Sequence, residues 1–489
     1  MRRRIVLLGI LVLAAGPLLV VKRARADESN GLGDVRSFQH MSQEDIVAGR
    51  LPLDRIIAHG KLLFDTPLNR LDGQGRPATT GGGAKRVADQ PPFIRTSAPD
   101  SSACAGCHSQ PRSGGGGDFV ANVFVLAQTL DPVTTSVDAE FSNERNTLGM
   151  MGAGPVEALG REMTRDLLGI RDEARRRAAA TGQPATLPLR TKGVDFGSVT
   201  AFPDGRLDTS RVVGVDVDLV IKPFHQKGVV RSIREFTVNA FNHHHGLQAV
   251  ERFGLERTGT RDFDEDGVED EMSVGDITAA TLYQATLNTP GRVRREDPVR
   301  GAAVRAGEAK FGMIGCTSCH VPKMTLDSPI FCEPYGLNPA GTFSDTSASY
   351  CFDMTRDGPK PRLERSGQTA IVRAFTDLKR HVICDAEVSH YCNEKKIQSG
   401  VPTNQFITRK LWDAGNSAPY GHRGDLTTLT EAIEAHGGEG RAARDAFLAL
   451  PRADRDAIIE FLKSLQILPD GSPIETPESA LKASSLNDR

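Results

Sequence analysis

The feature that most constrains this chain is a five-residue pattern, Cys-x-x-Cys-His, at residues 104–108 and again at residues 316–320. Two thiols three positions apart on one helical turn can both form thioethers to the vinyl groups of one porphyrin. The histidine that follows can then bind the haem iron as proximal ligand. A zinc or redox site could explain one copy, but two copies favour haem. The residues expected to hold two covalent haem c groups are Cys104, Cys107, His108, Cys316, Cys319 and His320.

The N-terminus has the organisation of an export signal. Arginines at positions 2–4 precede an apolar stretch at residues 5–21, and Ala24 and Ala26 supply the small-x-small pattern of a cleavage site. We therefore expect cleavage after Ala26 and a periplasmic protein without stable membrane insertion; the alternative is an uncleaved anchor. Residues 1–26 carry six of the 60 basic residues and none of the 62 acidic ones, so cleavage leaves a net charge of −8. Such a protein has no general attraction for nucleic acid, but a basic electron carrier is a compatible partner.

Four further cysteines follow the second motif. In an oxidising compartment an even set of remaining cysteines usually forms disulfides. Proximity in sequence favours Cys332–Cys351 and Cys384–Cys392 among the three connectivities, and a catalytic thiol is the alternative.

The fold class that we predict is mainly α, with two cytochrome c-like haem domains, long irregular loops and a small β-ribbon insertion. Apolar residues have helical spacing at 155–182 and 426–466, whereas alternating valines within 186–235 suggest the ribbon. The 49 glycines and 28 prolines suggest the irregular loops. The expected organisation is a signal peptide (1–26), an N-terminal haem domain with the insertion (27–300), a C-terminal haem domain (301–470) and a disordered tail (471–489).

A third candidate site is the D-x-D-x-D-G loop at residues 262–267. Alternating carboxylates before a glycine turn can wrap oxygen ligands around Ca²⁺, so Asp262, Asp264 and Asp266 are candidate calcium ligands. The twelfth position is Ser273, where a calcium loop has Glu. A solvated acidic turn is the alternative.

The segment 418–439 contains a Tyr-x-His-x-Gly turn, at residues 420–424, followed by Thr-Leu-x-x-Ala. It resembles the C-terminal segment of the bacterial di-haem cytochrome c peroxidase superfamily, in its di-haem oxidoreductase branch. The resemblance implies that the end of this helix delivers the distal ligand of the second haem, and the matching residue is His436. Bis-histidine ligation should give a lower potential than His/Met ligation. A surface histidine at a helix end is the alternative.

Residues 146–157 resemble the family's Gly-Ala-Gly-x-x-Glu segment, which implies Glu157 as the general acid/base of the first site. Such a group moves a proton between the peroxide oxygens while their bond breaks. A glutamate stabilised at a helix N-terminus is the alternative. No strong distal ligand follows the first motif, so we expect its iron to be open or loosely capped. The histidines at 243–245 could cap it, although burial with hydrogen bonds is their default interpretation.

Together these features predict a di-haem c-type oxidoreductase. We expect the C-terminal haem to take electrons from a small donor protein, a cytochrome c or a cupredoxin, and the N-terminal haem to reduce hydrogen peroxide to water. One alternative is an oxygenase that uses O₂ on an organic substrate. The other is a pure electron-transfer cytochrome with both irons six-coordinate.

Overall fold

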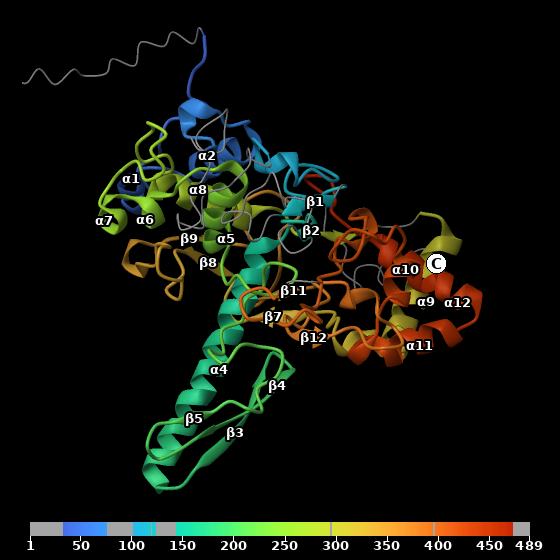
Figure 1. Ribbon diagram of the computed structural model, residues 1–489. Helices are drawn as coiled ribbons and strands as arrows, with labels where there is room; N and C mark the ends of the chain where they lie inside the picture. The colour runs from blue at the N-terminus through green and yellow to red at the C-terminus, as the bar shows by residue number, and fades with distance from the viewer. Residues whose placement is uncertain are drawn as a thin grey trace, which may run out of the picture. The chain divides into compact units, whose positions relative to one another are not determined.

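The structure, a computed structural model of the chain (Figure 1), describes residues 33–75, 101–118, 120–123, 143–293, 296–394 and 397–472. The predicted signal peptide and nearly all of the predicted tail lie outside these residues. The described residues from 36 onward belong to one compact unit. Nothing in it tests the predicted domain boundary at residue 300, which stays a prediction. No helix in the described ranges is long and apolar enough to cross a membrane.

The α-helices of the described ranges are, in chain order, α1 (Gln43–Val47), α2 (Leu53–Asp65), α4 (Ala153–Thr181), α5 (Ile233–Ala240), α6 (Val250–Phe253), α7 (Leu255–Thr258), α8 (Val274–Thr286), α9 (Pro298–Met313), α10 (Leu429–Glu434), α11 (Arg441–Ala449) and α12 (Arg452–Ser464). Shorter turns matter for the sites: η2 (Cys104–Gly106) and η5 (Cys316–Ser318) are 3₁₀ turns, and η4 (Phe241–His245) is a π-helical turn that continues α5.

The strands are short. They are β1 (Val120–Val123), β2 (Asn143–Asn146), β3 (Ala185–Thr191), β4 (Val194–Ala201), β5 (Leu207–Asp208), β6 (Gly291–Arg292), β7 (Met324–Leu326), β8 (Ile330–Glu333), β9 (Tyr350–Asp353), β10 (Glu364–Ser366), β11 (Thr369–Val372), β12 (Arg380–Val382), β13 (Gln405–Ile407) and β14 (Leu465–Gln466). Within the described residues they form small antiparallel sheets of two or three strands, in the orders β1-β2, β3-β4-β5, β6-β14, β7-β11-β10, β8-β9 and β12-β13.

The prediction of a mainly α fold is therefore wrong. The structure is 38% helical and 15% strand. The predicted ribbon exists as β3, β4 and β5, but the alternating valines after Val212 form no strand of it. The reason is that the irregular segments pair locally with each other, as β8 does with β9 where Cys332 stands opposite Cys351.

Helix α8 lies at the centre of the N-terminal part of the core. Nearly all of its residues are buried, and α2, α4 and α5 pack against it. Burial on every side is expected of a core helix. It begins with a capping box, in which Ser273 Oγ accepts the N–H of Asp276 and the Asp276 carboxylate accepts the N–H of Ser273. The same carboxylate binds His40 at 2.6 Å and His59 at 2.8 Å, which attaches the first described segments to α8.

A second core cluster lies between α9 and α12, where Phe311, Phe447 and Phe461 pack together. Helix α9 begins after Asp297, whose side chain accepts two backbone N–H groups, and has proline at its first position. Its C-terminus leads directly to the second Cys-x-x-Cys-His motif. In the same way α2 precedes the first motif and packs against η2. Both motifs thus stand beside a helix that is held by a packed core.

Candidate functional site: two histidine-lined cavities

The first motif lines a cavity of about 200 Å³. Cys104, Cys107 and His108 all line it, and both thiols are outside disulfides. His108 donates its Nδ1–H to the carbonyl oxygen of Gly115 at 3.3 Å. Burial, followed by the charge of His244, lowers the pKa of His108 to about 4, so the ring is neutral and its Nε2 carries a lone pair.

The second motif lines a separate cavity of about 230 Å³, together with His436. His320 donates its Nδ1–H to Phe375 O at 3.1 Å, and His436 donates its Nδ1–H to Ala432 O at 2.7 Å. The centroids of the two imidazole rings are 6.5 Å apart. Burial, followed by the charge of His436, lowers the pKa of His320 to about 4, and burial also lowers the pKa of His436.

These residues fit haem. A hydrogen bond from Nδ1 to a backbone carbonyl is the usual way in which a protein orients a metal-binding imidazole. Two coaxial imidazoles on one metal, with bonds of about 2 Å, would have their centroids about 6.3 Å apart, close to the separation of His320 and His436. In addition, both ring nitrogens of His422 are buried without a hydrogen-bond partner among the described residues, and this ring lines the second cavity. A buried polar group of this kind is expected to be satisfied by the cavity's occupant.

The two cavities differ in what stands near the proximal histidine. Within the described residues the aromatic ring in contact with His108 is Phe64, at a centroid distance of 6.0 Å, and no imidazole ring contacts it. Phe64 offers no ligand atom. Phe311 lies beside His320 in the same way, at a centroid distance of 6.2 Å. The difference between the sites is therefore the imidazole: His320 faces His436, whereas among the described residues no imidazole is in ring contact with His108.

One wall separates the cavities and lines both of them. Its residues are Asn146, Leu148, Gln226, Ile407, Thr408, Arg409 and Lys410. The Lys410 ammonium is partly buried and donates to Gly149 O at 2.7 Å. Burial lowers the pKa of Lys410 to about 8, and the charge of Arg409 lowers it further against the opposing effect of Asp413.

Glu157 does not line either cavity. Its side chain is fully buried in the second turn of α4, where one oxygen binds the Arg161 guanidinium and the other accepts the N–H of Ile233 at 2.7 Å. Arg161 in turn reaches Glu333 at 3.3 Å. Burial raises the pKa of Glu157 although Arg161 opposes the shift. The carboxylate thus holds the first residue of α5, which agrees with the alternative of a glutamate at a helix N-terminus better than with proton transfer in the cavity.

The three aspartates of the predicted calcium loop do converge. Ligand oxygens of Asp262, Asp264 and Asp266 lie within 4.8 Å of one another. Asp262 also accepts the backbone N–H groups of Asp266 and Gly267, at 3.1 and 3.0 Å. Ser273 is the N-cap of α8 and is already hydrogen-bonded there, so the twelfth position is not available to the loop.

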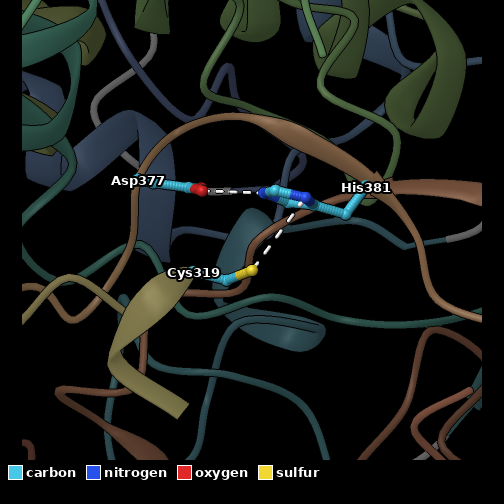
Figure 2. Close-up of side chains that lie close together, drawn as sticks. All are labelled: Cys319, Asp377 and His381. Carbon is cyan, nitrogen blue, oxygen red and sulfur yellow. Dashed lines mark hydrogen bonds and ion pairs between the residues drawn. The ribbon is translucent and has the colours of Figure 1, made fainter. Parts of the chain in front are cut away.

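A third group of ligand-type atoms adjoins the second cavity (Figure 2). His381 Nε2 lies 2.7 Å from Asp377, and Nδ1 lies 2.8 Å from Glu439 and 3.9 Å from Cys319 Sγ. Burial alone would lower the pKa of His381, but these hydrogen bonds raise it to about 11. His381 is thus an imidazolium between two carboxylates. Because Cys319 is the expected thioether sulfur, we interpret the group as a charged support of the second cavity and not as a separate metal site.

The disulfides were predicted correctly: Cys332 pairs with Cys351, and Cys384 pairs with Cys392. The second bridge connects segments that contribute Ile383 and Tyr391 to the second cavity. Sequence reasoning did not find His225, which lines the first cavity with His244 and His245. It carries no motif, and only its place in the fold brings it there.

Residues 365–465 match the family model described as "Di-haem oxidoreductase, putative peroxidase". No curated protein matches the chain. Among solved structures, the chain is similar to hydrazine synthase of Kuenenia stuttgartiensis, with 12% identity, a TM-score of 0.32 and coverage of 94% of this chain and all of that one. It is also similar to a MauG-like protein associated with microbial copper homeostasis, with 14% identity, a TM-score of 0.25 and coverage of 65% and 91%. Because both TM-scores are below 0.5, these similarities support no statement about the fold or function of the chain. The family match agrees with the resemblance seen in the sequence and covers the C-terminal segment that carries His436.

Proposed function

We propose that this chain is an exported c-type enzyme that reduces hydrogen peroxide to water. In this proposal Cys104 and Cys107 attach one haem and Cys316 and Cys319 the other. His108 and His320 are the proximal ligands, and His436 is the second ligand of the C-terminal haem. Haem iron supplies one-electron chemistry and, where one axial position is open, can also activate peroxide or oxygen.

The observation that carries the proposal is the difference between the cavities. His320 faces His436 at a ring-centroid distance of 6.5 Å, whereas no imidazole is in ring contact with His108 among the described residues. A bis-histidine site suits electron transfer, and a site with one histidine leaves room for a small substrate. This division between the sites favours an enzyme over a pure electron carrier.

Electrons would enter at the second cavity and reach the first through the shared wall of residues 407–410 and their neighbours. The net charge of −8 after signal cleavage suits a donor protein with a basic surface, such as a small cytochrome c or cupredoxin. The overall reaction takes one hydrogen peroxide, two electrons from the donor and two protons from water, and yields two water molecules. The O–O bond breaks and no atom other than these protons is added.

The test is steady-state turnover of the holoprotein with hydrogen peroxide and a reduced small c-type cytochrome, with and without prior reduction. Peroxide-dependent oxidation of the donor supports the proposal. Absence of turnover together with O₂ uptake in the presence of an apolar organic substrate would replace it by the oxygenase alternative. If neither reaction is found, the remaining alternative is a cytochrome that only transfers electrons.

We also propose that the loop at 262–267 binds one Ca²⁺. The convergence of Asp262, Asp264 and Asp266 supports it, because hard cations prefer several carboxylate oxygens. Elemental analysis after dialysis should find one calcium per chain in the native protein and none in Asp264→Asn. Equal calcium in both proteins, or none in either, would refute this site.

A further inference from the structure

A buried histidine of the second cavity has no hydrogen-bond partner in the described part of the chain. His422 lines this cavity and is only 5% exposed to solvent. Neither of its ring nitrogens accepts or donates a hydrogen bond within the described residues. Buried polar groups in proteins are nearly always paired, because an unpaired one keeps the cost of its desolvation. The ring therefore marks a place where the contents of the cavity present a polar group.

The imidazole of His422 is held in place by aromatic packing. It stacks on Phe406 at a centroid distance of 4.4 Å, with 32° between the two ring planes. Tyr391 lies on another side, at a centroid distance of 5.9 Å. The ammonium of Lys227 is 4.0 Å from the centroid of Phe406 and so restrains that ring as well. A ring fixed in this way presents its N–H in one direction.

His422 lies beside the wall that separates the two cavities. Its carbonyl oxygen accepts the N–H of Asn146, at 3.0 Å, and Phe406 precedes Ile407; both Asn146 and Ile407 belong to the wall. The second motif lines only its own cavity. In a haem held by thioethers, the two carboxylate groups lie on the half of the porphyrin that is remote from the thioether carbons. A haem attached at the second motif therefore directs its carboxylates away from the motif and toward the side of the cavity where His422 lies.

The charges around His422 favour an anion. The buried Lys227 ammonium donates to three backbone carbonyls within residues 402–405, at 2.6, 2.9 and 2.7 Å, and forms no ion pair with a carboxylate of the described residues. Burial, followed by the charges of Arg145 and Lys227, lowers the pKa of His422 to about 3, so the ring is neutral and carries one N–H. The cations that oppose a proton on this ring would attract a carboxylate.

We propose that His422 donates its ring N–H to a carboxylate group of the second haem. The other ring nitrogen is an acceptor and can take a hydrogen bond from water in the cavity. No proton is transferred, and the contact is a hydrogen bond to an anion, which is stronger than one between neutral groups. His422 is thus a positioning residue, and it also withdraws part of the negative charge that the carboxylate places near the iron. The inference rests on the haem attachment of the proposed function and does not depend on peroxide as the substrate.

The decisive variant is His422→Phe, which keeps a flat ring for packing on Phe406 and removes both nitrogens. The carboxylate then keeps more of its negative charge, which favours ferric iron, so the reduction potential of the second haem should shift to a lower value. The bending vibration of the haem carboxylate should shift as well in the resonance Raman spectrum. His422→Gln supplies an N–H donor again and should return both signals toward their native values. The low-spin signal should persist in both variants, because His320 and His436 are unchanged.

The matched control is His390→Phe, the same replacement at a histidine that lines neither cavity. It should leave the potential and the Raman spectrum unchanged. His422→Leu repeats the test with a smaller apolar side chain, in case phenylalanine impairs folding. A native-like potential and carboxylate vibration in both apolar variants would overturn the assignment. Loss of the low-spin signal in them would also overturn it, because His422 would then be a ligand of the iron, and so would a shift confined to the first haem.

These measurements separate the contact from the proposed reaction. A lower second-haem potential in His422→Phe, in a protein whose native form does not turn over peroxide, would support the contact and refute the peroxide reaction. Peroxide turnover in the native protein, with the potential unchanged in His422→Phe and His422→Leu, would refute the contact alone. A native protein with no covalent haem at the second motif would refute both.

Discussion

The two cavities begin from the same five-residue motif and differ in what stands opposite the proximal histidine. At both motifs the proximal histidine donates Nδ1–H to a backbone carbonyl, Gly115 at the first and Phe375 at the second. Each histidine also has a phenylalanine ring beside it, Phe64 at the first and Phe311 at the second. The second cavity then receives His436 opposite His320, while among the described residues no imidazole is in ring contact with His108. In the proposed holoprotein the motif therefore determines where haem attaches, and segments distant in sequence determine what the iron can do.

The cavities also differ in how their walls are assembled. Most of the second cavity comes from residues 311–462, within the C-terminal part of the chain. The first cavity combines Phe64, the turn at 223–226, α5 and η4 with residues 376–410 from the other half. A wall gathered from so many segments explains why its active side chains are harder to recognise in the sequence.

The largest expected effect is the conversion of the second site into a copy of the first. In His436→Ala the imidazole opposite His320 is lost, so the low-spin ferric signal of that haem should become high-spin or water-ligated. Electron paramagnetic resonance would measure this change, and added imidazole should restore the low-spin signal.

The control for that experiment is His390→Ala, which removes a nearby histidine that does not line the cavity. It should leave the spectrum unchanged. A low-spin second haem in His436→Ala without added imidazole would show that another residue is the ligand.

The next largest effect concerns Glu157, which holds the first residue of α5 beside the first cavity. Glu157→Gln should lower the free energy of unfolding by about 2–3 kcal/mol, because a buried guanidinium, Arg161, loses its closest charged partner. Chemical denaturation would measure this loss. The rate with peroxide should change little, because Glu157 lines neither cavity. A hundredfold slower peroxide reaction with unchanged stability would instead return Glu157 to the acid–base role.

The smallest effect lies in the wall between the cavities. Lys410, with a pKa lowered by burial to about 8, loses its positive charge as the pH rises through that value. A nearby positive charge favours the reduced haem, so the potential of the first haem should fall between pH 7 and pH 9, on the order of tens of millivolts. Spectroelectrochemistry should find this extra fall in the native protein and not in Lys410→Met. The same pH dependence in both proteins would contradict it.

The sequence predicted the parts of the molecule that depend on local spacing. The haem motifs, both disulfides and the long helix near residues 155–182, now α4, follow from patterns within a few turns of chain. The facing of His436 and His320 depended on a family resemblance, because 116 residues separate them. The mainly α prediction failed because helical periodicity is easy to recognise, whereas strands of two to four residues leave almost no pattern.

Predictions from local sequence patterns were least successful for the first cavity. Glu157 had the right residue type beside a glycine-rich turn, but packing directs its carboxylate to Arg161 and Ile233. His225 had no recognisable pattern, because its position depends on a left-handed turn held by Lys227 and on carbonyls nearly 180 residues away. Long-range contacts of this kind cannot be deduced from local spacing.

The central claim is that the two haem sites are unequal, and the spin state of the ferric holoprotein tests it most directly. Quantitative electron paramagnetic resonance should find one high-spin and one low-spin haem per chain. The low-spin signal should disappear in His436→Ala, and the high-spin haem alone should bind cyanide. Two low-spin haems in the native protein, with no cyanide binding to either, would contradict the account.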